Sequence, residues 1–178
     1  MISHLKIEHF KSIESLDIDC NQINIFIGEP NTGKSNILEA LALFTFMDQM
    51  SATPLSSYIR FKDLSNLFTD GILDRNVILE IRKQDLNKPM VSNAFGEGKY
   101  EESIEKITIK PESESYKLTD QVKDNSNFVN KWDMTFDFSG NSRGGGGILD
   151  YHSGIKYYIY KEFSEYIDLT SDALKPPF

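Results

Sequence analysis

Apolar and polar residues alternate along the first 27 positions of the chain. The apolar positions of this alternation are Leu5, Ile7, Leu16, Ile18, Cys20, Ile23, Ile25 and Ile27. A period of two that is rich in isoleucine is typical of half-buried strands. Residues 12–14 and 21–22 have the composition of turns. The pattern therefore predicts three strands, the last of which ends at Gly28.

The period changes after a short loop over residues 28–33. From Lys34 to about Met47, apolar residues recur at helical spacing. The apolar face is formed by Ile37, Leu38, Leu41, Ala42 and Phe44. A face this wide predicts a helix that packs against a sheet.

The rest of the chain reads mainly as strands. Residues 48–76 are mixed, and residues 83–103 are polar and predict a loop. Strands are expected at 77–82, 104–110, 131–138 and 155–163, with the first of these at a sheet edge. A flexible loop is expected at 139–147, which includes the four glycines 144–147. Short turns without intervening helices favour an antiparallel β subdomain.

One motif carries recognisable chemistry. Gly28-Glu29-Pro30-Asn31-Thr32-Gly33-Lys34-Ser35 matches G-x-x-x-x-G-K-[ST], the phosphate-binding P-loop, between a predicted strand and a predicted helix. The glycines allow close backbone approach, and the helix N-terminus directs N–H groups at phosphate. Lys34 supplies charge, and the Ser35 hydroxyl is a ligand for Mg²⁺. The expected nucleotide-binding residues are Gly28, Asn31, Thr32, Gly33, Lys34, Ser35 and Asn36, and the expected cofactors are ATP and Mg²⁺.

The N-terminal region resembles a known family. Three segments look like the start of RecF/SMC/OLD-type AAA ATPases, which have ABC-type heads: Leu5-Lys6-Ile7-Glu8-His9-Phe10-Lys11-Ser12-Ile13, Ile25-Phe26-Ile27-Gly28, and Gly33-Lys34-Ser35-Asn36-Ile37-Leu38-Glu39-Ala40-Leu41. Residues 63–68 and 174–178 also resemble OLD-like ATPases. The resemblance is sharp over about residues 2–44.

The resemblance implies an α/β P-loop fold with an antiparallel β subdomain and with the strand before Gly28 at the centre of its sheet. It also implies that ATP is sandwiched between two heads, so a second head is an expected partner. Lys11 becomes a candidate contact for a second phosphate or for the ribose. His9 stands where the family commonly has Asn, and Glu29-Pro30 replaces a more typical pair.

The acidic half of the family's hydrolytic site is not recognisable. Hydrolysis requires a strand of four apolar residues ending in Asp-Glu, and Val77-Ile78-Leu79-Glu80 does not fit it. Phe138-Ser139-Gly140 only faintly resembles the signature loop. We therefore interpret residues 1–178 as the N-terminal lobe of a longer ATPase. Residues 1–50 form its P-loop part, and residues 51–178 form the β subdomain.

Two other functions stay open. A GTPase is suggested by Asn130-Lys131-Trp132-Asp133 and Asp137-Phe138-Ser139-Gly140, although the two motifs stand in the wrong order. A nucleotide-binding switch or assembly module that does not hydrolyse ATP is the other alternative. A kinase is disfavoured because the few arginines form no cluster.

Composition and net charge limit the expected partners and cellular location of the protein. A formal net charge of −8 disfavours non-specific DNA binding, so a DNA contact is expected to need other parts of the protein. One cysteine and no apolar run of membrane-spanning length predict a cytoplasmic protein without a membrane partner. By family analogy alone, the expected setting is DNA transactions or anti-phage defence.

Overall fold

The structure is a computed structural model that describes residues 1–30, 32–49, 54–84, 91–92, 98–99, 102–124 and 127–147. The strand predicted at 155–163 and the family-like residues 174–178 lie outside the described residues. Among those that are described, no helix is long and apolar enough to cross a membrane.

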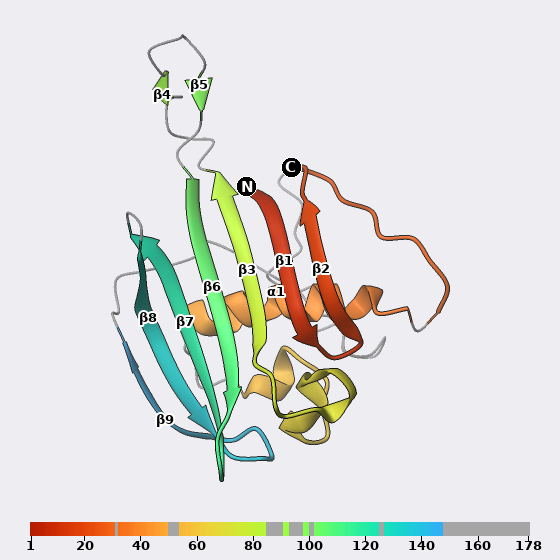
Figure 1. The fold of residues 1–178 in the computed structure, drawn as a ribbon, viewed down its shortest axis with the longest axis vertical. Coiled ribbons are helices and arrows are strands. Elements are labelled where there is room, and N and C mark those ends of the chain that lie inside the picture. The colour runs from red at the N-terminus through yellow and green to blue at the C-terminus, as the bar shows by residue number, and fades with distance from the viewer. Residues whose placement is uncertain are drawn as a thin grey trace, which may run out of the picture.

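One seven-stranded sheet forms the body of the molecule, in the order β2-β1-β3-β6-β7-β8-β9 (Figure 1). Its strands are β1 (Ile2–Phe10), β2 (Ile13–Asp19), β3 (Val77–Gln84), β6 (Glu102–Pro111), β7 (Tyr116–Asp124), β8 (Asn127–Phe136) and β9 (Ser142–Gly147). A separate small pair consists of β4 (Val91–Ser92) and β5 (Gly98–Lys99). Every neighbouring pair of strands is antiparallel, as expected for the strands after residue 50. Strands β1 and β2 belong to the same sheet as these later strands, so the described residues form an antiparallel sheet with one α-helix and do not clearly show the expected α/β fold.

The period of two explains the register of the sheet. Leu5 of β1 lies opposite Ile81 of β3, and Ile7 lies opposite Leu79, which in turn lies opposite Ile107 of β6. These apolar residues are buried because alternate side chains of a strand point to the same face. The result is a continuous apolar inner face.

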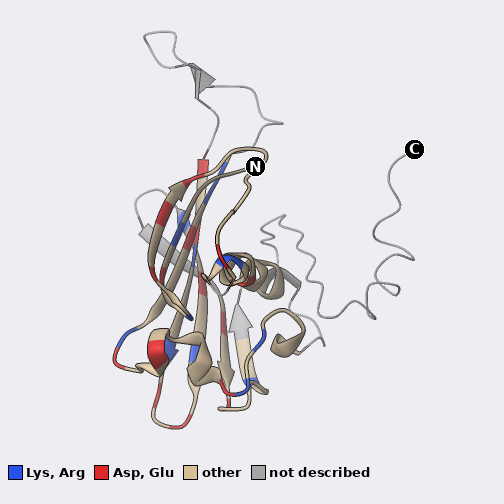
Figure 2. Cartoon of the chain, turned by 90° about the vertical axis from the view of Figure 1, so that its right-hand side faces the viewer, with Lys and Arg blue, Asp and Glu red and all other residues tan. Residues whose placement is uncertain are grey.

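Helix α1 (Lys34–Gln49) runs across this inner face and ends slightly later than the predicted end at about Met47 (Figure 1). Seen edge-on, the helix lies on one side of the sheet (Figure 2). The ring of Phe46 lies 6.0 Å from that of Phe136 in β8 and 5.4 Å from that of Tyr58. The helix is therefore covered by the sheet and also by the connection after it, which contains η1 (Leu55–Ser57), η2 (Leu64–Leu67) and η3 (Thr69–Gly71).

The third predicted strand is wrong. Residues 21–28 form no strand, and the side chains of Ile23, Ile25 and Ile27 are 81%, 77% and 90% exposed. The chain leaves the edge strand β2 and swings outward before it reaches α1 (Figure 1). Alternation determines which side chains share a face, but it supplies no neighbouring strand, and none of the described strands pairs with this segment. The strand expected at the centre of the sheet before Gly28 is therefore absent.

Three further expectations need correction. The strand at 77–82 is interior, because β3 lies between β1 and β6. Strand β7 was not predicted, since Asp120 occupies an inward position between Leu118 and Val122 and breaks the apolar alternation. The loop expected at 139–147 is a strand from residue 142 onward. There a Cβ on Gly145 would lie 2.5 Å from the carbonyl oxygen of Asp133, so only glycine allows this close pairing.

Cys20 lies just after β2 and lines an apolar hollow with Leu5, Phe26 and Leu41. Burial raises the pKa of its thiol, and the Asp19 carboxylate raises it further. Because less thiolate is present at a given pH, Cys20 is expected to react with iodoacetamide at pH 8 more slowly than free cysteine does. The rate should increase in Asp19→Asn and on unfolding in urea. A native rate equal to that of free cysteine would contradict the assigned environment.

Candidate functional site

The P-loop connects the outer edge of the sheet to α1. The backbone N–H groups of Asn36 and Ile37 donate to the carbonyl oxygen of Gly33, at 2.9 and 3.3 Å, and so close the first turn of the helix. Gly33 has φ +84°, and a Cβ there would lie 2.7 Å from Ser12 Oγ. Only glycine meets both conditions, so the motif's second glycine fixes the loop against the β1–β2 turn.

Lys34 lies folded back over the loop. Its Nζ donates to the carbonyl oxygens of Gly28 and Glu29, at 2.9 and 2.5 Å, and to Thr32 Oγ1 at 3.1 Å. Thr32 Oγ1 in turn donates to the Glu29 carbonyl oxygen at 2.8 Å. The Lys34 ammonium group thus holds the loop closed. Its three hydrogen bonds go to loop oxygen atoms, and phosphate oxygens can take the place of these acceptors.

A cleft of ≈ 300 Å³ opens beside these residues. It is lined by Ser12, Thr32, Gly33, Lys34, Ser35, Asn36 and Arg60. The structure therefore brings together five of the predicted site residues. Gly28 contacts Lys34, and Asn31 lies outside the described residues. The lining contains two cations and no carboxylate, and the hydroxyl of Ser35 is available as a metal ligand, so the set suits an anion with Mg²⁺.

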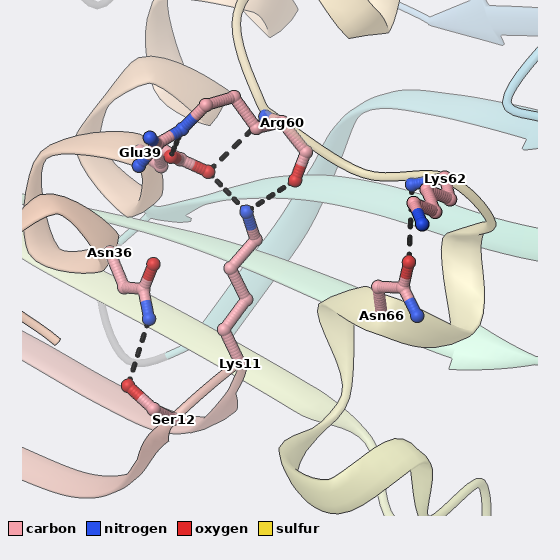
Figure 3. A network of polar contacts seen from close by, with 7 residues as sticks. All are labelled: Lys11, Ser12, Asn36, Glu39, Arg60, Lys62 and Asn66. Carbon is pink, nitrogen blue, oxygen red and sulfur yellow. Dashed lines mark hydrogen bonds and ion pairs between the residues drawn. The ribbon is translucent and has the colours of Figure 1, made fainter. Parts of the chain in front are cut away.

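Sequence reasoning missed two lining residues, Ser12 and Arg60. The family-like turn at residues 9–12 directed attention to this part of the chain, but to Lys11 rather than to Ser12. The Ser12 hydroxyl accepts from Asn36 Nδ2 at 2.8 Å, which joins the turn to the helix N-terminus (Figure 3). No sequence motif indicated Arg60 as a site residue, because it lies in the irregular connection after α1.

Lys11 occupies a strained turn. Both His9 and Lys11 have positive φ angles, of 56° and 53°. Asn, Asp and His are the non-glycine residues that best tolerate this conformation, which explains how His9 replaces the family's Asn. The Lys11 N–H donates to the Leu67 carbonyl oxygen at 3.0 Å, so the turn is also tied to η2.

The Lys11 ammonium group is engaged inside the protein rather than directed into the cleft (Figure 3). It donates to the Glu39 carboxylate and to the Arg60 carbonyl oxygen, the latter at 2.6 Å. Its side chain is 12% exposed. Burial lowers the pKa of Lys11, and the neighbouring Glu39 opposes that shift. A direct contact between Lys11 and a nucleotide stays a prediction.

A second, open hollow of ≈ 660 Å³ adjoins the cleft and shares Ser12 and Arg60 with it. Its lining also includes Lys11, Phe61, Lys62 and Asp70. Three basic residues thus meet one acidic residue here, in contrast to the net charge of the chain. The larger hollow therefore continues from the smaller cleft, which the P-loop residues line.

Two aspartates of the GTPase alternative have structural roles. Asp133 lies in β8, and its carboxylate pairs with Lys117 of β7 at 3.2 Å. The Asp137 carboxylate accepts from the N–H groups of Asn141 and Ser139, both at 2.9 Å, and the bonds from Asn141 are the main reason that its pKa is lowered. Residues 138–140 form the turn before β9 and no signature loop. In the described part of the chain, no cluster of His, Cys, Asp or Glu side chains suits a metal ion.

A protein family and a known protein match parts of this chain. A family model described as "AAA ATPase domain" matches residues 1–166. The DNA replication and repair protein RecF of Leptospira interrogans serogroup Icterohaemorrhagiae serovar copenhageni (strain Fiocruz L1-130) is 30% identical over 84 residues. That match covers 45% of this chain and 23% of RecF, so the chain matches less than a quarter of that relative's length.

Proposed function

Because this chain belongs to the AAA ATPase domain family, we propose that it binds ATP·Mg²⁺ in the cleft beside the P-loop. The observation that carries the proposal is the meeting of Lys34, Ser35 and Arg60 around one cleft at the N-terminus of α1. Backbone N–H groups at that helix end add a favourable electrostatic field for phosphate.

The side chains take distinct roles in this proposal. Lys34 Nζ exchanges its carbonyl partners for phosphate oxygens, and Arg60 offers a second cation at the same cleft. Ser35 supplies a hydroxyl ligand for Mg²⁺, and a bound Mg²⁺ would neutralise part of the phosphate charge. Gly28, Asn31, Thr32, Gly33 and Asn36 complete the loop around the phosphates.

We further propose that the chain is the ATP-binding lobe of a RecF/SMC/OLD-like ATPase that pairs with a second head. A role in DNA transactions is supported by the similarity to the DNA replication and repair protein RecF. Anti-phage defence rests on family analogy. None of the residues that line the cleft is acidic, so hydrolysis is proposed only for an assembly that supplies a carboxylate to orient water.

Calorimetric titration of this chain with ATP·Mg²⁺ and GTP·Mg²⁺, followed by a phosphate-release assay, tests the proposal. We expect saturable binding of ATP·Mg²⁺ without turnover. Absence of ATP binding would refute the site, and a preference for GTP would restore the GTPase alternative. Turnover by the isolated chain would show that a catalytic carboxylate lies within it.

A further inference from the structure

Glu39 is a buried acid that the P-loop chemistry leaves unexplained. It lies on α1 just beyond the P-loop, and it is only 3% exposed among the apolar residues of the helix's covered surface. An ionised carboxylate in such a place is costly unless cations and N–H groups compensate it. An apolar residue of similar size would fill the same volume, so packing alone does not call for a carboxylate.

Two cations converge on Glu39 from two other segments (Figure 3). Oε1 accepts from Arg60 Nε at 2.7 Å. Oε2 accepts from Lys11 Nζ and from the backbone N–H of Arg60, the latter at 3.3 Å. Lys11 Nζ also donates to the Arg60 carbonyl oxygen. Glu39 therefore contacts the backbone N–H and the side chain of Arg60, and Lys11 contacts its carbonyl oxygen.

These contacts leave the terminal nitrogens of the Arg60 guanidinium available to a ligand. Only Nε of the guanidinium donates to Glu39, while the terminal nitrogens carry four further N–H donors. The Arg60 side chain is 64% exposed and lines both the P-loop cleft and the adjoining hollow. Fixing Nε therefore sets the direction in which the remaining donors face.

We propose that Glu39 is a positioning residue that holds the Arg60 guanidinium toward the phosphate groups of a nucleotide bound at the P-loop. The inference rests on the proposed binding of ATP·Mg²⁺. It assigns Lys11 the same task, because its ammonium group fixes the Arg60 backbone. Arg60, ordered before the ligand arrives, loses less side-chain entropy on binding than a free arginine would.

The first test is a double-mutant cycle on the affinity for ATP·Mg²⁺. Glu39→Gln keeps the shape but removes the charge, and we expect about tenfold weaker binding. In an Arg60→Ala background the same change should have no further effect, because Glu39 then has no guanidinium to hold. Glu8→Gln is the matched control, because Glu8 lies on β1 outside the cleft and pairs there with Lys6 at 2.9 Å. The Glu8→Gln variant should bind ATP·Mg²⁺ with the affinity of the wild type.

A second test does not depend on nucleotide. In NMR spectra of the chain alone, the Arg60 Nε–H should exchange slowly with solvent and lose this protection in Glu39→Gln but not in Lys34→Ala. Arg60→Lys, which replaces an exposed side chain, retains the charge without the Nε donor. We expect it to bind ATP·Mg²⁺ as weakly as Arg60→Ala does, so the link remains testable if Glu39→Gln does not fold.

Three results would overturn the positioning role: wild-type affinity in Glu39→Gln, an equal loss in the Arg60→Ala background, or wild-type affinity in Arg60→Lys. Failure of the proposed function looks different. In that case the wild-type chain itself does not bind ATP·Mg²⁺, while the Arg60 Nε–H signal still reports whether the Glu39 contact exists.

Discussion

Replacing Lys34 with alanine is expected to weaken ATP·Mg²⁺ binding by about 100-fold, because the substitution removes a charge-assisted contact worth about 3 kcal/mol. The side chain donates only to atoms of its own loop, at Gly28, Glu29 and Thr32, so the sheet and α1 should remain folded. Calorimetric titration gives the dissociation constant, and circular dichroism gives the unfolding midpoint.

Lys6→Ala is the matched control for Lys34→Ala. Lys6 lies on β1 between the buried residues Leu5 and Ile7, and therefore on the sheet face opposite to α1. Its removal should leave the dissociation constant unchanged. If Lys34→Ala also retained wild-type affinity while folded, the nucleotide would have to bind elsewhere. If both variants lost affinity equally, a general effect of charge would account for the loss.

Gly140→Ala is expected to destabilise the chain by about 3 kcal/mol. Gly140 has φ +83°, and a Cβ there would lie 2.5 Å from Cζ and 2.6 Å from Cε2 of Phe61. Both backbone strain and a steric clash therefore act at this turn. For a chain of this size, the melting temperature should decrease by roughly 6–12 °C.

Gly71→Ala separates the two causes. Gly71 has φ +67°, but a Cβ there would meet no atom within 4 Å, so only strain of about 1 kcal/mol applies. Phe61→Leu removes the far end of the clashing ring and should make the Gly140→Ala change less costly in the double variant. Equal effects of the two alanine substitutions would show that the Phe61 ring moves aside at no measurable cost.

The sequence was most informative where chemistry depends on consecutive residues. The P-loop motif and the helix after it were predicted because glycine, lysine and serine must stand at fixed spacing. The resemblance to RecF/SMC-type ATPases is confirmed by the family match over residues 1–166. Alternation also predicted β1 and β2, because the apolar face of each packs on the core.

Interactions between distant segments could not be predicted in the same way. The network of Lys11, Glu39 and Arg60 joins three segments, and no local pattern relates them. Strand β9 was hidden because a run of glycines shows no apolar alternation, and β7 was hidden by its buried Asp120. The alternating isoleucines 23, 25 and 27 gave a wrong prediction of a strand. Such a pattern forms a strand only beside a neighbouring strand, and the described residues supply none there.

The sheet order has a consequence for chain entropy. Strands β1 and β3 are neighbours in the sheet, yet the P-loop, α1 and the segment that carries Arg60 all lie between them in the chain. The P-loop cleft is thus built on one long connection whose two ends are fixed by the pairing of β1 with β3. The entropy of closing that loop is lost when the sheet folds rather than when a ligand binds. A ligand that binds in the cleft therefore meets a connection whose two ends are already fixed.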